Sequence, residues 1–581
     1  MAKRVSEQSV EHEFYDSFPR NYKIGKTKYI VITGSVMSGV GKGTFSSCLA
    51  TLLTHQGLKV SPIKFDGYLN YDAGTLNPYR HGEVFVLSDG TECDLDLGSY
   101  ERSLHRDLSK DNYLTAGKIF KTIIDKERAG KYLGRDVQFI PHVTGEIKKF
   151  LRELAVKSSA DIVLVEVGGT VGDLENSYFI EATRELRHEE GRDNVCFVNV
   201  TYVIQPGSLD EFKSKPAQLG IRKLMELGTP PDIIICRSEN PVGRNILEKL
   251  STFSNVPVEK IFNLYDIRDI YEIPPMLKKE GVDSAFFEIL KIEPKDIKIK
   301  SNFKEWESFV RKAKNAKKTV NIGIVGKYTN VKDSYISILK ALEHSGPYLG
   351  ARVKPEWIES SILENNRRLD DVFKNIDGII IPGGFGKRGI EGKINAIKYA
   401  RENKIPLLGL CLGMQLSSVE FARNVCGLKG ANSTEFAERT KNPVICTMEE
   451  QKAILKKEKF GGTMRLGDYK CGLKKDTISW KAYGMQKYIF ERHRHRYEFN
   501  NKFRKIFEEK GMIIAGLNPE KDLVEIIELK NHPFFVGTQF HPELKSRPLQ
   551  PHPLFVEFVK AAIVSGKNKK VPQSTQKRKS S

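Results

Sequence analysis

The chain has 581 residues, of which 40% are hydrophobic, and its formal net charge is +20. This length exceeds one ordinary hydrophobic core, so we expect two or more domains. No run of about 20 apolar residues is present, and the start MAKRVSEQSVEHEFYDS lacks the apolar core of a signal peptide, so we expect a cytoplasmic protein without a membrane partner. No C-x-x-C pair occurs among the eight cysteines, which favours reduced thiols over disulfides or zinc.

The basic charge raises nucleic-acid binding as a hypothesis. Part of that charge lies in residues 567–581, a tail without acidic residues that we expect to be disordered. The rest of the chain shows no zinc-finger spacing, aromatic RNA-binding motif or basic heptad array. We therefore expect phosphate-bearing small molecules as ligands, and no nucleic acid.

In chain order, residues 1–28 are polar and irregular, and the run KYIVITGSVMSGVGKGTFSSCLATLLTHQG (28–57) predicts a strand, a glycine-rich loop and a helix. Short apolar runs flanked by helical patterns are typical of buried parallel strands. Such runs lie at 60–65, 161–170, 194–204 and 231–238.

The hydrophobic runs stop at a charged connector, residues 297–318, and then a second series begins. Its members are 319–328, 378–384, 405–411 and 533–543. This alternation predicts two doubly wound, Rossmann-like α/β domains, at 29–296 and 319–566.

The first domain contains a variant of the phosphate-binding loop, from Gly34 to Thr44, in which Val36 stands where a strict pattern needs glycine. Its glycines let backbone N–H groups approach a polyphosphate, Lys42 supplies a positive charge, and Thr44 can reach a metal or a phosphate. Lys64, at the end of the next strand, adds a second cation. Nucleotide binding is the favoured interpretation, and a purely structural turn is the alternative.

An acidic segment, TECDLDLG (91–98), follows. If it is extended, Glu92, Asp94 and Asp96 share one face, because alternate residues of a strand do so. Glu166 ends a predicted parallel strand at the edge that meets the loop. We therefore predict that Asp96 and Glu166 bind Mg²⁺, which with the loop implies phosphoryl transfer; a solvated acidic loop is the alternative.

The second domain contains PLLGLCLGMQ, in which Gly409 and Gly413 flank Cys411. A G-x-C-x-G turn between a strand and a helix lifts the thiol out of the sheet, and the helix N-terminus stabilises a thiolate. A small buried residue at the end of a strand is the alternative. Other residues must therefore decide whether this cysteine is a nucleophile.

Those residues follow in GTQFHPE, where a strand ends at His541 and Glu543 points to the same side. In GIIIPGGFG (378–386), a glycine turn has N–H groups that can stabilise an oxyanion beside the Leu412 amide. Cys411 as nucleophile, His541 as acid and base, and Glu543 as orienting group together predict hydrolysis of glutamine with release of ammonia.

The strings GLCLGMQ, PGGFG and QFHPE resemble class I glutamine amidotransferases. The strings HGEVFVLSDGTECDLDLGSYER, VEVGGTVGDLE, KSKPAQ, NSTEF, GTMRLG and ERHRHRYE are similar to those of CTP synthases, in family order. The resemblance implies a ligase of pyrimidine nucleotide biosynthesis, in which ATP phosphorylates O4 of UTP and ammonia from glutamine displaces the phosphate. It also implies Mg²⁺, activation by GTP, feedback inhibition by CTP, and homotetramers able to form filaments.

The resemblance also implies binding residues. For ATP these are Ser38, Gly39, Val40, Gly41, Lys42, Gly43, Thr44, Lys64 and Asp96, with Tyr265, Asp266 and Ile267 near the adenine. For UTP or CTP they are Asp173, Leu174, Glu175, Lys213, Lys215, Gln218 and Lys249. For glutamine they are Gly384, Leu412, Gly413, Met414, Gln415, Glu435 and Arg496, and the lid for GTP contains Arg388, Gly389 and Glu391.

Three departures from the family pattern lie near nucleotide segments, namely Ser35, Gly67 and residues 177–178. Two other functions remain open: an amidase of the cobyrinic-acid type, and an ATP-dependent partition or filament protein of the ParA type. The strings HGEVFV and KSKPAQ argue against the amidase. Cys411, His541 and Glu543 are unexplained by a filament protein.

Overall fold

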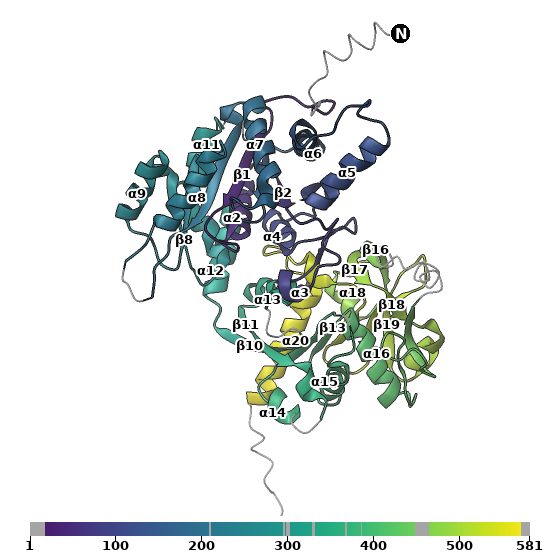
Figure 1. The fold of residues 1–581 in the computed structure, drawn as a ribbon. Helices are drawn as coiled ribbons and strands as arrows, with labels where there is room; N and C mark the ends of the chain where they lie inside the picture. Colours follow the sequence, from purple (N-terminus) through teal and green to yellow (C-terminus); the bar gives the residue numbers. More distant parts are fainter. Residues whose placement is uncertain are drawn as a thin grey trace, which may run out of the picture. The chain divides into compact units, whose positions relative to one another are not determined.

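The computed structural model describes residues 18–207, 211–293, 295, 297, 302–327, 332–365, 369–384, 386–447 and 464–570 (Figure 1). The chain folds into two compact units. Unit 1 comprises Met1–Thr75 and Ser99–Val310, and unit 2 comprises Leu76–Gly98 and Arg311–Ser581. Residues 76–98 therefore pack in unit 2, although their place in the sequence predicts the first domain.

Unit 1 contains a seven-stranded sheet in the order β5-β2-β6-β1-β7-β8-β9. Its strands are β1 (Lys28–Gly34), β2 (Val60–Asp66), β5 (Tyr113–Thr115), β6 (Ile162–Val167), β7 (Val195–Tyr202), β8 (Ile233–Ser238) and β9 (Ile261–Tyr265). Every neighbouring pair is parallel. The predicted parallel sheet is confirmed, with the purple strand β1 in its middle (Figure 1).

Helices cover this sheet. They are α2 (Lys42–His55), α5 (Ala116–Arg128), α6 (Thr144–Ser158), α7 (Ser177–Glu190), α8 (Lys215–Glu226), α9 (Arg244–Ser254), α10 (Ile273–Lys279) and α11 (Val282–Ile289). Side chains of α6 and α7, such as Leu151 and Phe179, share a core with Val165 of β6. Ile221 of α8 and Leu250 of α9 share another with Ile234 of β8. Strands buried in this way need the near-continuous apolar runs seen in the sequence.

Unit 2 contains a nine-stranded sheet in the order β11-β10-β12-β13-β21-β20-β19-β16-β17. Its strands are β10 (Lys318–Gly326), β11 (Ala351–Glu359), β12 (Gly378–Ile381), β13 (Leu407–Leu410), β16 (Arg465–Leu473), β17 (Tyr488–His495), β19 (Met512–Leu517), β20 (Val524–Leu529) and β21 (Phe535–Thr538). The pairs from β11 to β21 are parallel, and those from β21 to β17 are antiparallel. The antiparallel half was not predicted.

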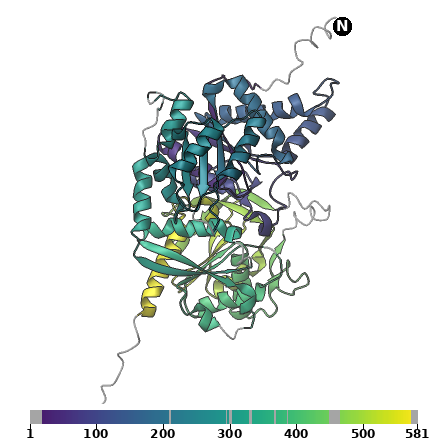
Figure 2. The ribbon, with the colours of Figure 1, turned by 60° about the vertical axis from the view of Figure 1, so that its left-hand side comes forward.

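Helices cover both faces of this second sheet (Figure 2). Helices α13 (Ile336–Tyr348) and α20 (Pro553–Lys570) share one core with β10, and α15 (Ile390–Glu402) and α16 (Leu412–Asn424) share another with β12. Shorter elements are α3 (Pro78–His81), α14 (Leu369–Phe373), α18 (Ile478–Ala482), α19 (Arg504–Glu509), β3 (Phe85–Val86), β4 (Glu92–Cys93), β14 (Asn432–Ser433), β15 (Pro443–Thr447) and β18 (Tyr497–Phe499). No helix among the described residues is both long and apolar enough to cross a membrane.

The predicted connector is not structureless, because it contains helix α12 (Phe303–Lys314). Phe303, Trp306 and Phe309 are buried, and the Trp306 indole N–H donates to the Tyr271 carbonyl at 2.9 Å. Apolar residues three apart form one face of a helix, and this pattern was overlooked among many lysines. At the other end, α20 continues to Lys570, so part of the predicted tail is helical, and residues 571–581 lie outside the described chain.

The acidic segment 91–98 is not one extended strand, so that prediction is wrong. Strand β4 covers only Glu92 and Cys93, and helix α4 (Leu95–Leu104) begins two residues later. The Asp96 backbone N–H donates to the Asp94 carboxylate at 3.0 Å. Aspartate commonly accepts the N–H groups that open a helix, and this local bond replaces the expected alternation of side chains.

Candidate functional site

The glycine-rich loop of unit 1 joins β1 to α2. Gly39 and Gly41 have φ angles of 74° and 96°, which glycine adopts without steric cost. No side chain caps the first turn of α2, and helix N-termini of this kind are favourable sites for anions. The Lys42 ammonium donates to the Gly169 carbonyl at 2.6 Å. This backbone agrees with the predicted phosphate-binding role of the loop, which stays a prediction.

Two charged residues lie beside this loop on neighbouring strands. Lys64 of β2 and Glu166 of β6 are partners in register, and the Lys64 ammonium lies 2.8 Å from Glu166 Oε1. The Tyr100 hydroxyl donates to Glu166 Oε2 at 2.6 Å. Both carboxylate oxygens of Glu166 therefore have protein partners, and its role as a ligand of Mg²⁺ stays a prediction. Asp96 belongs to unit 2, so its pairing with Glu166 stays a prediction.

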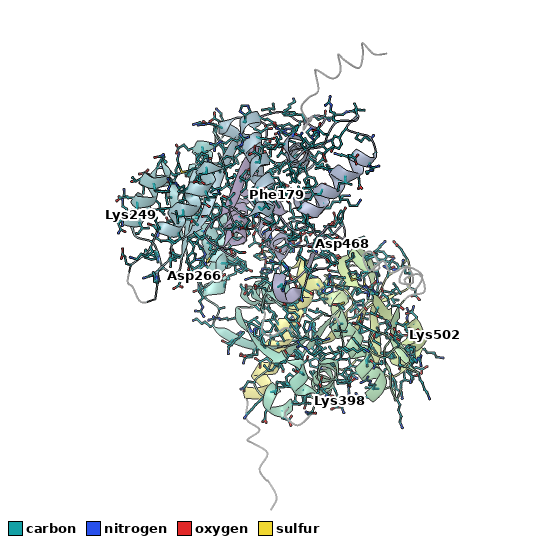
Figure 3. All side chains as sticks on the ribbon, viewed as in Figure 1. Phe179, Lys249, Asp266, Lys398, Asp468 and Lys502 are labelled. Atoms are coloured by element: carbon teal, nitrogen blue, oxygen red, sulfur yellow. The ribbon has the colours of Figure 1, made fainter. Side chains whose placement is uncertain are left out.

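Arg237, at the end of β8, was missed by the sequence reasoning. Its guanidinium donates to the Leu264 carbonyl at 3.1 Å and pairs with Asp266. A Cβ atom on Gly41 would lie 3.2 Å from Arg237 Nε. Arg237 therefore connects the phosphate loop to the segment predicted to lie near adenine, where Figure 3 labels Asp266. The available signal was a charged residue ending an apolar strand.

The residues predicted for UTP lie on three segments, and two of these, the loop after β6 and α8, approach each other. Asp173 Oδ2 accepts the Thr170 N–H at 2.8 Å in the loop after β6. A Cβ atom on Gly172 of that loop would lie 3.8 Å from Lys223 Cγ of α8. The remaining predicted residues on this side are Leu174 and Glu175 in the loop, Lys213, Lys215 and Gln218 around the start of α8, and exposed Lys249 on α9 (Figure 3).

The structure accommodates two of the departures. The Ser35 hydroxyl is buried and donates to Thr201 Oγ1 at 2.9 Å, and it accepts from Asn199 Nδ2 at 3.2 Å. Both partners lie on β7, so Ser35 ties the loop to the sheet. A Cβ atom on Gly67 would lie 2.5 Å from Asn176 Oδ1. The side chain of Asn176 therefore fills the space of any larger residue.

In unit 2, Cys411 stands between the end of β13 and the start of α16, with φ 51° and ψ −100°. Non-glycine residues rarely adopt such a backbone, and strain of this kind concentrates at functional sites. A Cβ atom on Gly413 would lie 2.1 Å from the Ile381 carbonyl oxygen. A Cβ atom on Gly409 would lie 2.8 Å from Gly413 C. The tight turn therefore requires both glycines, as the sequence predicts.

His541 and Glu543 lie in the same site as Cys411. All three line a cavity of about 100 Å³ together with Gly383, Gly384 and Arg494. His541 Nδ1 lies 2.7 Å from Glu543 Oε1. Burial acts to lower the pKa of His541, but the neighbouring Glu543 carboxylate and Cys411 thiol raise it well above its ordinary value. Nε2 of His541 has no hydrogen-bond partner among the described atoms, so it is free for proton transfer.

Several residues predicted to bind glutamine surround this cavity. The Gln415 amide N–H donates to the Tyr497 carbonyl at 2.9 Å, and Glu435 Oε1 accepts the Gly386 N–H at 3.1 Å. Burial raises the pKa of Glu435, against the opposing effects of the Gly386 N–H, Lys327 and Arg496. Gln539, which was not predicted, donates to Cys411 Sγ at 3.8 Å.

Two buried lysines, also not predicted, hold the glycine turn that follows β12. The Lys393 ammonium is fully buried and donates to the Pro382 carbonyl at 3.1 Å. Burial, with repulsion from Lys327, lowers its pKa to about 7. Lys327 donates to the Gly386 carbonyl, and burial lowers its pKa to about 8. Sequence reasoning missed both lysines, because a lysine within a helix or just after a strand is usually exposed to solvent.

The predicted GTP lid adjoins these lysines. The Arg388 guanidinium donates to the Lys327 carbonyl, Gly389 has a φ of 71° and begins α15, and Glu391 pairs with Arg423 at 2.9 Å. Arg388 is therefore linked, through Lys327, to the turn that borders the cavity.

The segment 76–98 contributes to this unit. The Arg494 guanidinium lies 2.8 Å from Glu92 Oε1, and Arg492 Nη1 donates to the Val86 carbonyl at 3.1 Å. Glu83 accepts the Ser337 N–H at 3.2 Å and lines the cavity. Glu92 is thus the partner of an arginine in unit 2, which corrects its placement in a carboxylate cluster.

Comparisons with known proteins identify both halves. Residues 28–292 match the family described as CTP synthase N-terminus, and residues 330–561 match Glutamine amidotransferase class-I. The CTP synthase of Caldanaerobacter subterraneus is 50% identical, covering 92% of this chain and 98% of the relative. The CTP synthase of Methanothermobacter thermautotrophicus is 49% identical, and the match covers 92% of this chain and 98% of the relative. A solved glutaminase domain of Trypanosoma brucei CTPS, with bound acivicin, is 36% identical, covers 42% of this chain and 93% of that chain, and gives a TM-score of 0.39. The chain belongs to the CTP synthase family.

Proposed function

We propose that this chain is a glutamine-hydrolysing CTP synthase, a ligase that aminates UTP with consumption of ATP. The observation that carries the proposal is the arrangement of Cys411, His541 and Glu543 around one cavity, in a chain whose other unit contains a glycine-rich loop before a helix that no side chain caps. A nucleophile, a base and an orienting carboxylate in this geometry are the groups that amide hydrolysis needs.

The glutaminase step begins when His541 Nε2 takes the thiol proton of Cys411. The thiolate attacks the side-chain amide carbon of glutamine, and the Gly384 and Leu412 N–H groups stabilise the oxyanion. The imidazolium returns its proton to the leaving nitrogen, which departs as ammonia. Water, activated by the same imidazole, then hydrolyses the thioester to glutamate.

The synthetase step uses the loop at 38–44, where backbone N–H groups and Lys42 bind the ATP phosphates and Lys64 adds a second positive charge. The γ-phosphoryl group passes to O4 of UTP, which makes that oxygen a good leaving group. Ammonia attacks C4, and phosphate departs to leave CTP. Asp96 and Glu166 would hold Mg²⁺, which neutralises charge on the phosphates when it is bound.

Regulation by GTP and by CTP belongs to the same proposal. Arg388 donates to the Lys327 carbonyl, and Lys327 donates to the Gly386 carbonyl. A guanine nucleotide bound at Arg388, Gly389 and Glu391 would therefore act on the turn that borders the cavity. CTP would inhibit from the UTP residues Asp173 to Glu175 and the start of α8, within a homotetramer.

The test is CTP formation by the full chain from UTP, ATP and glutamine, with and without GTP. We expect one glutamate and one ADP for each CTP, and faster synthesis with GTP. ATP consumption without glutamine hydrolysis would support a partition or filament protein instead. Amidation of a corrinoid acid, with no CTP formed, would support the amidase.

A further inference from the structure

The side chain of Gln539 lies against the Cys411 thiol, and the proposed chemistry does not use it. Strands β13 and β21 are parallel neighbours in which Leu410 pairs with Thr538. The residues that follow these two, Cys411 and Gln539, therefore leave the same edge of the sheet side by side. The Cys411 N–H donates to the Thr538 carbonyl at 2.7 Å, so the backbone holds the two residues in this position.

Gln539 is completely buried, and buried amide groups need hydrogen-bond partners. Its Nε2 donates to Cys411 Sγ at 3.8 Å, and its Oε1 lies 3.4 Å from Gln415 Nε2. The backbone N–H of Gln539 donates to the Glu525 carbonyl at 2.8 Å. Each of these polar groups therefore has a partner, and the partner of Nε2 is the atom that attacks glutamine in the proposed reaction.

The direction of the Gln539 amide is fixed by its neighbours, although the oxygen and the nitrogen of an amide have nearly the same shape. Gln415 Nε2 lies 2.9 Å from the Tyr497 carbonyl. A carbonyl can only accept, so the nitrogen of Gln415, and not its oxygen, is on that side. The second N–H of this nitrogen is directed to Gln539, which must present its oxygen. Gln539 therefore presents an N–H to Cys411.

An N–H donor at the sulfur stabilises a thiolate more than a thiol, because hydrogen bonds to ionised acceptors are roughly twice as strong as those between neutral groups. The thiol itself donates to the Arg494 carbonyl at 3.8 Å. When His541 takes the thiol proton, the electron pair stays on the sulfur and this bond is lost. The bond from Gln539 is kept and strengthened. Catalytic hydrogen bonds are often long before the substrate binds.

We propose that Gln539 is a catalytic residue of the glutaminase step, whose side-chain N–H stabilises the Cys411 thiolate while Gln415 holds the amide in this direction. The role differs from those of Gly384 and Leu412, whose N–H groups are assigned to the oxyanion of the substrate. The inference rests on the proposed glutaminase function of this cavity. It gives a role to the first residue of the QFHPE string.

Charged groups also act on the sulfur, and the test must leave them unchanged. They are His541, Glu543, Arg494 and Glu83, which line the same cavity, and the buried Lys393 of α15. Gln539 is neutral. Replacing it by another neutral side chain therefore removes a hydrogen-bond donor and leaves this set of charges as it is.

Gln539→Met keeps nearly the same length and volume but removes the donor. We expect glutamine-dependent kcat to fall about 10- to 100-fold, with the KM for glutamine within about threefold of the parent. Gln550→Met makes the same change at an exposed position and should leave both values unchanged. CTP synthesis from ammonium salt by each full-length variant should equal that of the parent. An unchanged kcat, with or without a raised KM, would overturn the proposal.

Alkylation of Cys411 reports on the thiolate without glutamine. Iodoacetamide reacts with the thiolate form, and the Cys411 peptide is followed by mass spectrometry. At pH 7 we expect alkylation of Gln539→Met to be about tenfold slower than that of the parent and of Gln550→Met. The difference should shrink as pH rises, because at high pH the sulfur is ionised with or without the donor.

Equal or faster alkylation of Gln539→Met at pH 7 would overturn the proposal, even if glutamine hydrolysis by the parent is normal. A parent chain that hydrolyses no glutamine, but whose Cys411 still reacts about tenfold faster than that of Gln539→Met, would refute the proposed function alone.

Discussion

The two units hold their reactive groups in different ways. In unit 1, no side chain caps the helix end after Gly41. In unit 2, Cys411 is almost fully buried on a strained backbone, and His541 and Glu543 are already bonded to each other. Polyphosphate can be bound by charge and by many backbone donors, whereas a nucleophile must be aligned before its substrate arrives. Unit 1 should therefore be most sensitive to loss of charge, and unit 2 to small changes of geometry.

The largest effect expected from loss of charge is that of Lys42→Ala. Because the ammonium compensates phosphate charge, we expect CTP synthesis from glutamine and from ammonium salt to fall by about 100-fold or more. Release of glutamate at Cys411 should persist in the same variant. Lys121→Ala, at an exposed lysine paired with Asp125, is the control and should leave synthesis unchanged. Equal activity of the two variants would show that the loop does not bind the phosphates.

The alignment of unit 2 is tested by Glu543→Gln, which keeps the shape of the side chain. Without the carboxylate, the pKa of His541 falls, because burial lowers it and only the Cys411 thiol still opposes burial. Less imidazolium is then present at neutral pH to protonate the leaving nitrogen. We expect a loss of about 10- to 100-fold in glutamine-dependent kcat, with ammonia-driven synthesis retained. A pH–rate profile identical to that of the parent would contradict the role of Glu543.

Lys393→Met should have two smaller effects in opposite directions. It should increase the stability of the fold and weaken the binding of glutamine. The pKa of Lys393 is lowered from 10.5 to about 7, so between these values the unfolded chain binds more protons and the stability due to this group rises with pH. Replacing it should raise the melting temperature more at pH 6.5 than at pH 9.5. It should also weaken glutamine binding, because the Pro382 carbonyl loses its donor.

Lys398→Met, on the same helix (Figure 3), is the control for this variant. We expect neither effect there. A melting-temperature gain that does not change with pH would show that the buried ammonium is not titrating in this range.

The smallest effect is expected from ending the chain after Lys570, the last residue of α20. Apart from Val571 and Pro572, the removed residues 571–581 are polar or basic, so they have little apolar surface to bury. We expect CTP synthesis within about twofold of the parent and an almost unchanged melting temperature. A large loss of either would mean that these residues bind to the folded units.

The sequence predicts those parts of the fold and of the site that are formed by one short, continuous segment of the chain. The strand, loop and helix around Lys42, and the turn around Cys411, each depend on glycines and apolar residues within one short segment. His541 and Glu543 were found because they follow an apolar run, although the strand β21 ends at Thr538 and not, as predicted, at His541. Local pattern therefore suffices where the neighbours in space are also neighbours in sequence.

The parts of the fold and of the site that were not predicted depend on contacts between residues that are distant in sequence. Strand β16 buries its residues only irregularly, so its run RLGDYKCGL does not look like the interior of a sheet. The contact of Glu92 with Arg494 joins residues 402 apart. Lys393 is fully buried and donates to the Pro382 carbonyl, 11 residues away in the sequence. Composition and spacing do not indicate which distant residues are in contact in the folded chain.

The most direct test of the account is Cys411→Ala in the full chain, assayed with glutamine and with ammonium salt as nitrogen sources. Alanine fits the turn and removes only the nucleophile, so the loss of folding stability should be about 1 kcal/mol. We predict no CTP from glutamine, and CTP from ammonium salt at the parent rate, increasing with pH as the fraction of free ammonia increases. Glutamine-driven synthesis in this variant, or loss of synthesis from ammonium salt, would contradict the separation of the two chemistries.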